Sequence, residues 1–242
     1  MSDRIWLNPD FIKNCFYVQS HGVETDYKER LKLYEIYEHA ENILSKNPNE
    51  HDLICAIFQL NRAIELRDKQ LNKNYKFKKI PSLIKKYEQH LVMEELGIIK
   101  PLLKNKLNTI RNQSAHSTKY PALKLSEIKE LAEFTWYFLR STDLIASRKP
   151  DSIIYDNSIF EAEDDEPSKA LWIELNFNLD TWEIELRGNI YSDKISHDYI
   201  TDFLEIEIER QSISDKIIHL NGKIIGPKIL IYEIIKKYFS TF

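Results

Sequence analysis

Apolar residues recur every three or four positions through most of the first 147 residues, a spacing typical of helices that bury one face. The clearest such run lies at 50–74, and its inward positions are predicted to be Leu53, Ile57, Leu60, Ile64 and Leu71. Asn49 stands before this run as an expected N-cap. Further helices are predicted at 26–46, 82–96, 100–116 and 126–147. Gly97 is expected to end the 82–96 helix.

The periodicity changes to two after residue 168, where apolar residues alternate with charged ones. Strands are therefore predicted at 171–177, 182–186 and 204–208, followed by a helix at 229–239. Asn221-Gly222 lies between two apolar pairs and is expected to be the turn of a hairpin. The predicted fold class is α+β, with an N-terminal helical bundle and a small antiparallel sheet domain that ends in a helix.

Three parts are expected along the chain. Residues 1–147 form a helical domain whose core is 50–147, and its first 26 residues are expected to be irregular. Residues 148–168 contain two prolines and an acidic run, which predicts an acidic linker. Residues 169–242 form the sheet domain with its terminal helix.

Charge is distributed unevenly over a chain of net charge −4. Residues 1–150 hold 25 Lys and Arg against 19 Asp and Glu, a net of +6, while 151–242 hold 9 against 19, a net of −10. Such asymmetry indicates two domains with different partners. Five glutamates of the predicted strands are expected on one face, where they form a solvated surface or one that repels RNA: Glu183, Glu185, Glu205, Glu207 and Glu209.

Length and composition limit the class of protein. A chain of 242 residues with 43% apolar and 30% charged residues can bury a full core. No apolar run reaches the roughly 20 residues of a membrane span, and the first residues lack a signal-peptide core. Two cysteines are too few for a disulfide framework, so a cytoplasmic protein without a membrane partner is expected.

The candidate chemistry lies at the end of the predicted 100–116 helix, where Arg111, Asn112 and His116 are close in sequence. An arginine can hold a phosphate with a planar fork of donors, and a histidine can transfer a proton near neutral pH. Asn112 and His116 share a helix face, but Arg111 is about 140° away from His116 around an ideal helix. Two copies around a two-fold axis would bring two such sets together in one groove.

These residues resemble the signature of the HEPN superfamily (higher eukaryote and prokaryote nucleotide-binding domains), which is an arginine, often a polar residue, and a histidine four to six residues later. The resemblance extends to residues 60–67 and 134–143 and covers roughly 50–147. It implies an all-α bundle, a homodimer with a composite site, and often a metal-independent endoribonuclease. Members commonly serve in toxin–antitoxin, antiphage or CRISPR-associated systems, which implies an antitoxin or regulatory protein as a further partner.

The chemistry implied by the resemblance is attack of an RNA 2′-hydroxyl on the adjacent phosphate. His116 would act as the general base or acid, Arg111 would stabilise the developing charge, and Asn112 would hold the phosphate or orient the histidine. One variant of the family has a tyrosine two residues after the histidine. This chain has Thr118 at that position, which puts regulation by modification of such a tyrosine in doubt.

Other interpretations of the same residues stay open. His116 can also be interpreted as a histidine whose positive charge is favoured by the C-terminus of a helix. Arg111 and Asn112 can also be interpreted as buried polar contacts in a dimer that catalyses no reaction. The alternative function is a non-catalytic dimeric module that binds a protein or nucleotide partner. A basic stretch interleaved with aromatic residues is interpreted either as an RNA-binding surface or as a solvated helix end: Lys76, Lys78, Lys79, Lys85 and Lys86. The remaining histidines lack ligand spacing, so neither a metal nor another cofactor is expected.

Overall fold

The computed structural model describes residues 4–10, 12, 16–24, 27–81, 88–100, 102, 105–106, 109, 112, 124–156, 172–214 and 216–240. The fold is α+β, as predicted. The chain divides into two compact units. A helical unit contains Glu24–Phe77 and Tyr87–Lys149, and a sheet unit contains Met1–Val23, Lys78–Lys86 and Pro150–Phe242.

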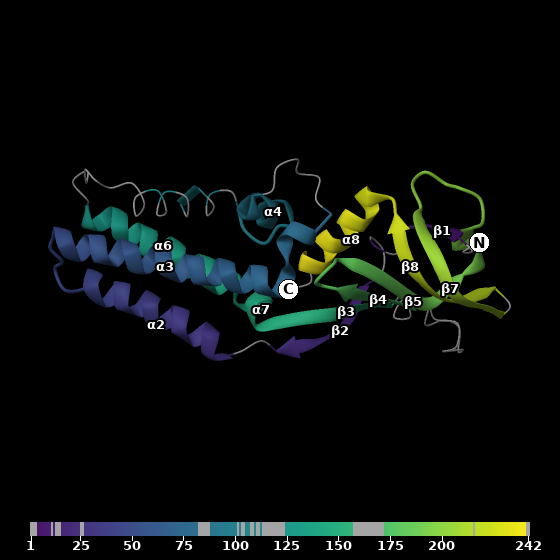
Figure 1. Ribbon diagram of the computed structural model, residues 1–242, viewed down its shortest axis with the longest axis horizontal. Coiled ribbons are helices and arrows are strands. Elements are labelled where there is room, and N and C mark those ends of the chain that lie inside the picture. The colour runs from purple at the N-terminus through teal and green to yellow at the C-terminus, as the bar shows by residue number, and fades with distance from the viewer. Residues whose placement is uncertain are drawn as a thin grey trace. The chain divides into compact units, whose positions relative to one another are not determined.

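The helical unit is built on three long helices that lie side by side (Figure 1). They are α2 (Tyr27–Leu44), α3 (Glu50–Tyr75) and α6 (Leu125–Ser141), with the short helices α4 (Gln89–Glu95) and α7 (Asp143–Ser147) beside them. All five apolar positions predicted to face inward on α3 are buried. The repeat of three and four therefore identified the core face of this helix correctly.

Local side chains define two of the helix ends. Asn49 Oδ1 accepts a hydrogen bond from the backbone nitrogen of Asp52, and Asp52 Oδ2 accepts one from the backbone nitrogen of Asn49, both at 3.0 Å. This reciprocal pair satisfies two of the unpaired donors at the start of α3. Gly97 has a φ of +77° just after α4, and the nitrogen of Ile98 donates to the carbonyl oxygen of Met93 at 2.8 Å. A glycine in the left-handed region ends the helix there, as predicted.

One buried ion pair connects α3 to the junction of α6 and α7. The guanidinium of Arg67 is fully buried, and its Nη2 lies 2.6 Å from Asp143 Oδ1, while its Nη1 donates to the carbonyl oxygen of Thr142 at 3.2 Å. The hydroxyl of Tyr34 on α2 donates to Asp143 Oδ2 at 2.7 Å. Burial, and next the hydrogen bond to Asp143, raise the pKa of Tyr34 to about 12, so the phenol remains a donor at neutral pH.

In the sheet unit, the described residues form eight strands in the order β2-β3-β4-β5-β8-β7-β1-β6. Their bounds are β1 Arg4–Leu7, β2 Phe16–Glu24, β3 Arg148–Asp156, β4 Trp172–Asn178, β5 Glu183–Tyr191, β6 Ile195–Ser196, β7 Leu204–Ser214 and β8 Ile217–Gly226. From β3 to β6 along this order every pairing is antiparallel. The expected strands at 171–177, 182–186 and 204–208 are confirmed, but β5 continues five residues and β7 six residues past the expected ends.

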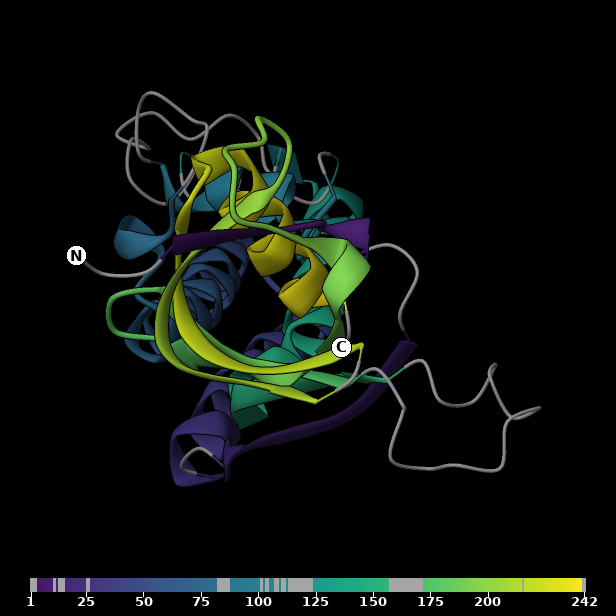
Figure 2. The same cartoon turned by 90° about the vertical axis from the view of Figure 1, so that its right-hand side faces the viewer.

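The sheet curls around α8 (Lys228–Ser240, yellow), which confirms the predicted closing helix (Figure 2). The inward face of the strands is apolar and buried, with Ile184, Leu186 and Ile224 as examples. At one end of α8 the rings of Phe177, Trp182, Tyr238 and Phe239 pack with centroids 4.8 to 6.4 Å apart. The alternation of apolar and polar residues in the strands therefore separates a core side from an outer, polar side.

Two segments expected to lack regular structure contain strands. Residues 1–26 were expected to be irregular, but β1 pairs with both β7 and β6, and β2 forms one edge of the sheet. Residues 148–168 were expected to be a linker, but β3 occupies the first nine of them, and Ser152–Asp156 pairs with β4. The error in β1 has a physical reason, because four residues give too short a pattern and their partners are distant in sequence. The error in β3 came from Pro150, which stands near the start of a strand, where proline is tolerated.

Asn221-Gly222 was expected to be a hairpin turn and instead lies in the middle of β8, paired with β5 on one side and β7 on the other. The chain turns between Ser214 and Ile217. A Cβ atom at Gly222 would lie 2.6 Å from the carbonyl oxygen of Glu207 on β7. Glycine is therefore needed here for the close approach of a neighbouring strand rather than for a turn.

Among the residues that the structure describes, none of the helices combines the length and the apolar character that crossing a bilayer requires.

Candidate functional site

Of the three predicted catalytic residues, the structure describes Asn112, while Arg111 and His116 lie outside the described residues. Asn112 is helical and exposed. Three other described residues of this segment, Leu102, Asn105 and Thr109, are also helical and exposed, and the spacing of three, four and three places all four on one helix face. The hydroxyl of Thr109 donates to the carbonyl oxygen of Asn105 at 3.0 Å. Asn112 thus lies on the solvent-facing side of a helical segment.

Lys106 connects this segment to α6. Its ammonium lies 2.7 Å from Glu130 Oε1 and 5.3 Å from the centre of the Phe134 ring. Both partners are on α6, one turn apart. The stem of Lys106 can lie against the aromatic ring while the charge meets the carboxylate. Lys106, five residues before Arg111, is therefore held against α6.

Phe134 and Tyr137 form an apolar edge of α6 that is partly open to solvent. Tyr137 is 56% exposed, and Phe134 is half-buried beneath Lys106. Trp136 packs against Tyr37 of α2 with ring centroids 5.7 Å apart, and Arg140 lies 4.7 Å from its ring centre. A hollow of about 530 Å³ between α2 and α6 is lined in part by Tyr37, Lys129 and Trp136. The helical unit thus presents aromatic side chains on its surface.

The predicted RNA-binding lysines are described only in part. Lys76 is the C-cap of α3 and has a left-handed backbone conformation, with φ of +45°. Its backbone nitrogen donates to the carbonyl oxygen of Asn72. Lys78 and Lys79 are exposed on a short 3₁₀ helix. Lys85 and Lys86 lie outside the described residues. The structure places two exposed lysines next to each other and does not test a surface made of all five.

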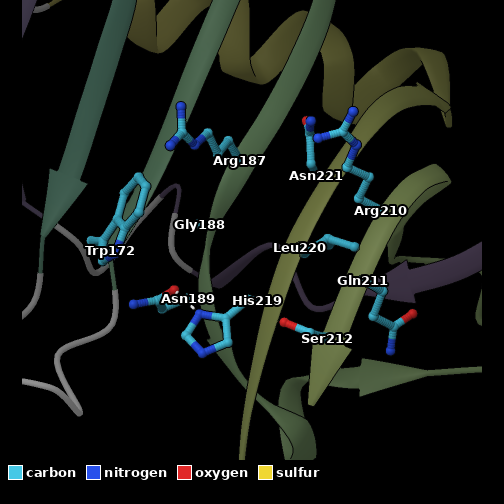
Figure 3. Close-up of a pocket in the computed structure, with 10 residues that line it drawn as sticks. All are labelled: Trp172, Arg187, Gly188, Asn189, Arg210, Gln211, Ser212, His219, Leu220 and Asn221. Atoms are coloured by element: carbon cyan, nitrogen blue, oxygen red, sulfur yellow. Dashed lines mark hydrogen bonds between the residues drawn. The ribbon is translucent and has the colours of Figure 1, made fainter. Parts of the chain in front are cut away.

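A groove of about 630 Å³ on the sheet was not identified from the sequence (Figure 3). It crosses strands β4, β5, β8 and β7, and most of its side chains are polar or basic. The residues that line it are Trp172, Arg187, Gly188, Asn189, Arg210, Gln211, Ser212, His219, Leu220 and Asn221. The positions at which these strands pair explain why their side chains meet.

Two rows of side chains cross the groove, as the register shows. In one row Arg187 is opposite Asn221, which is opposite Arg210. In the other row Trp172 is opposite Asn189, which is opposite His219, which is opposite Ser212. The two rows are two residues apart along each strand, which is about 7 Å.

A β-bulge in β7 places Arg210 in the groove. The register shifts between Ile208, which is opposite Gly222, and Arg210, which is opposite Asn221, so Glu209 is the extra residue. An unbroken alternation would have put Glu209 opposite Asn221. The bulge therefore sets Arg210 opposite Asn221, next to the glutamates that the sequence led us to expect on one face.

The floor of the groove depends on a glycine. A Cβ atom at Gly188 would lie 2.3 Å from the carbonyl oxygen of Trp172 on the neighbouring strand. No side chain fits at that distance, so glycine lets β4 approach β5 closely. Trp172, which stands at the edge of the groove in Figure 3, is positioned by this approach.

His219 is held by a hydrogen bond across the strands. Its Nδ1 lies 2.5 Å from Asn189 Oδ1, as the dashed line in Figure 3 shows. A carboxamide oxygen only accepts hydrogen bonds, so Nδ1 carries the hydrogen and Nε2 is left for a ligand. The imidazole is exposed, and its orientation is fixed by its neighbour on β5.

The groove is a basic area on an acidic part of the chain. Residues 151–242 have a net charge of −10 and contain two arginines, Arg187 and Arg210, both of which line the groove. Among the residues that the structure describes, no carboxylate lines it and neither arginine has an ion-pair partner, although Glu174 is opposite Arg187 on β4.

The acidic residues outside the groove are partly paired. Lys223 lies 2.8 Å from Glu183, and Arg4 lies 2.7 Å from Glu205. The hydrogen bond from Lys223 lowers the pKa of Glu183, and the same hydrogen bond raises the pKa of Lys223. Arg4 and Lys223 are therefore each paired with a glutamate, whereas Arg187 and Arg210 have no ion-pair partner among the described residues.

Comparisons of the chain with family models, with curated proteins and with solved structures find no match. The HEPN resemblance therefore rests on the residues quoted for it and stays a prediction.

Proposed function

We propose that this protein is a metal-independent endoribonuclease of the HEPN type, acting in the cytoplasm as a toxin or antiphage defence component. The observation that supports this best is the position of Asn112. Asn112, the second residue of the Arg-Asn-x3-His motif, is helical and exposed, as are Asn105 and Thr109 before it. A catalytic motif needs access to a polymeric substrate, and an exposed face provides it.

In the proposed reaction the 2′-hydroxyl of RNA attacks the adjacent phosphorus, and the bond to the 5′-oxygen of the next nucleotide breaks. His116 removes the hydroxyl proton or donates a proton to the leaving oxygen. Arg111 donates hydrogen bonds to the phosphate oxygens as negative charge develops on them. The products are a 2′,3′-cyclic phosphate and a 5′-hydroxyl end.

The proposal includes a homodimer, because one copy of the motif places Arg111 and His116 on different sides of an ideal helix. The exposed Tyr137 and the half-exposed Trp136 on α6 are suitable for such an interface, since aromatic side chains are enriched in the cores of protein interfaces. We expect light scattering at micromolar concentration to give a mass near twice 28.8 kDa. A monomer at that concentration would contradict a composite site.

The activity itself is tested with purified protein and a single-stranded RNA labelled at its 5′ end, in excess EDTA. We expect cleavage. The downstream fragment should accept phosphate directly from a polynucleotide kinase at its 5′ hydroxyl. The 5′-labelled fragment should be extended by a poly(A) polymerase only after a cyclic phosphodiesterase and a phosphatase have freed its 3′ hydroxyl. Single-stranded DNA of the same sequence should remain intact, because it lacks the attacking hydroxyl. Cleavage that requires added divalent metal, or equal cleavage of DNA, would overturn the proposal.

A second candidate function is a non-catalytic module that binds a protein partner, such as an antitoxin or regulator. The aromatic surface and the hollow between α2 and α6 support it. In this case the chain would form a stable complex with its partner and would not cut RNA under any condition of the assay. The EDTA experiment therefore separates the two functions.

A further inference from the structure

We propose that the groove on the outer face of the sheet binds single-stranded RNA, with the phosphates along the row of Arg187, Asn221 and Arg210 and the bases over the row of Trp172, Asn189 and His219. The site would hold RNA apart from the motif at Arg111–His116. The choice of RNA as the ligand rests on the proposed function. The existence of the groove and its positive charge do not depend on that function.

The arginine row is suited to a phosphodiester backbone. Arg187 and Arg210 flank Asn221 from two different strands, so their backbones are two strand spacings apart, about 10 Å. Each guanidinium presents a planar fork of donors that matches a phosphate and stays charged at any working pH. Without a carboxylate among the described lining residues, neither arginine is neutralised inside the groove.

The local charge contrast favours an anionic ligand. The sheet unit is acidic, and on its outer face Glu185 and Glu207 are opposite Lys223, in the row next to that of the arginines. Glu183, which pairs with Lys223, lies two residues before Glu185 on β5. Because an acidic face repels RNA, an RNA chain would be directed to the basic groove. Glu174 stands beside Arg187 and limits the basic row at the β4 end.

The second row is suited to bases. Trp172 stands at one edge of the groove with an indole ring that a base can stack on, and such stacking is tolerant of sequence. Asn189 and His219 follow in the same row, and amide and imidazole groups hydrogen-bond the edges of unpaired bases. The rows lie about 7 Å apart, so a single strand can run across the β-strands with its phosphates on one row and its bases on the other.

The test measures RNA affinity by fluorescence anisotropy with a short labelled oligoribonucleotide, using the full chain in a His116→Ala background and EDTA so that the probe is not cut. Replacing both Arg187 and Arg210 by alanine should weaken binding at least about 10-fold, because two charge-assisted contacts are lost. The slope of log affinity against log salt should also fall by about 1.4, the value for two phosphate contacts on a single strand. Trp172→Ala should weaken binding about 5-fold or more, and Trp172→Phe should weaken it less.

Lys223→Ala is the matched control, because it removes a cation from the same face but outside the groove. Its affinity should stay within about two-fold of the parent, and all variants should unfold at the same urea concentration. Equal loss with Lys223→Ala and with the arginine variants, or no loss with either, would overturn the groove, and tighter binding of the same sequence as DNA would overturn RNA as its occupant. If the groove variants lose binding while unmodified protein never cuts RNA, the proposed function fails and the groove stands.

Discussion

Replacing His116 by alanine is expected to lower the rate of RNA cleavage at least about 100-fold, the low end for a general acid–base group. The reason is specific to the proposed reaction, in which the 2′-hydroxyl is a weak nucleophile until its proton is removed. The measurement is the single-turnover cleavage rate of a labelled RNA in EDTA. Far-ultraviolet circular dichroism should show the helical content of the parent protein.

His39→Ala serves as the matched control, because His39 is exposed on α2 and lies in neither of the two proposed RNA sites. Its cleavage rate should equal that of the parent. Arg111→Ala should lower the rate by a similar factor to His116→Ala, and Arg111→Lys should restore only part of it, because an ammonium keeps the charge but not the planar fork. Undiminished cleavage by His116→Ala would remove the assignment of the motif as the catalytic centre.

Replacing Asp143 by alanine is expected to lower the free energy of unfolding by about 3 to 5 kcal/mol. In the parent protein the Asp143 carboxylate lies 2.6 Å from the fully buried guanidinium of Arg67. The substitution leaves this buried cation without its anion. The hydroxyl of Tyr34 loses its acceptor in the same change. Urea unfolding followed by circular dichroism measures the effect as a lower midpoint with an unchanged slope.

The control for this change is Arg140→Ala, which removes a second cation near the same carboxylate. Arg140 lies 3.7 Å from Asp143, and its side chain is 58% exposed. An exposed pair of this kind contributes less than about 1 kcal/mol, so the two variants should differ severalfold in their effect. Similar effects from both would mean that burial of Arg67 is not what makes the Asp143 contact important.

The helices and the long strands were predictable because their information is local. The apolar spacing of α3, its cap at Asn49 and the glycine after α4 all act within a few residues, and the structure confirms each of them. Strand β1 was not predictable in the same way, since its four residues owe their structure to β7 and β6, far along the chain. The prediction of a turn at Asn221-Gly222 was wrong for a related reason. A residue pair that favours turns can also occur in a strand where a neighbouring backbone approaches closely.

The two candidate sites differ in how far the sequence could reveal them. The motif at Arg111–His116 is contiguous and was found from the sequence, although the structure describes only Asn112 of its three residues. The groove is assembled from four strands, and its arginines are 23 positions apart. Simple alternation along β7 also could not show that Arg210 is opposite Asn221, because that pairing depends on one extra residue in the strand. No local pattern could have brought Arg187, Arg210 and Trp172 together.

During synthesis, β1 leaves the ribosome about 200 residues before the strand that it pairs with, since Arg4 is opposite Glu207. At about 5 to 20 residues per second, that interval lasts roughly 10 to 40 s. The helical unit, whose last residue is Lys149, is complete well before then and can fold first. A fragment that ends near residue 150 would therefore retain β1 and β2 as orphaned strands prone to aggregation, and a fragment meant to isolate the helices should begin at Glu24.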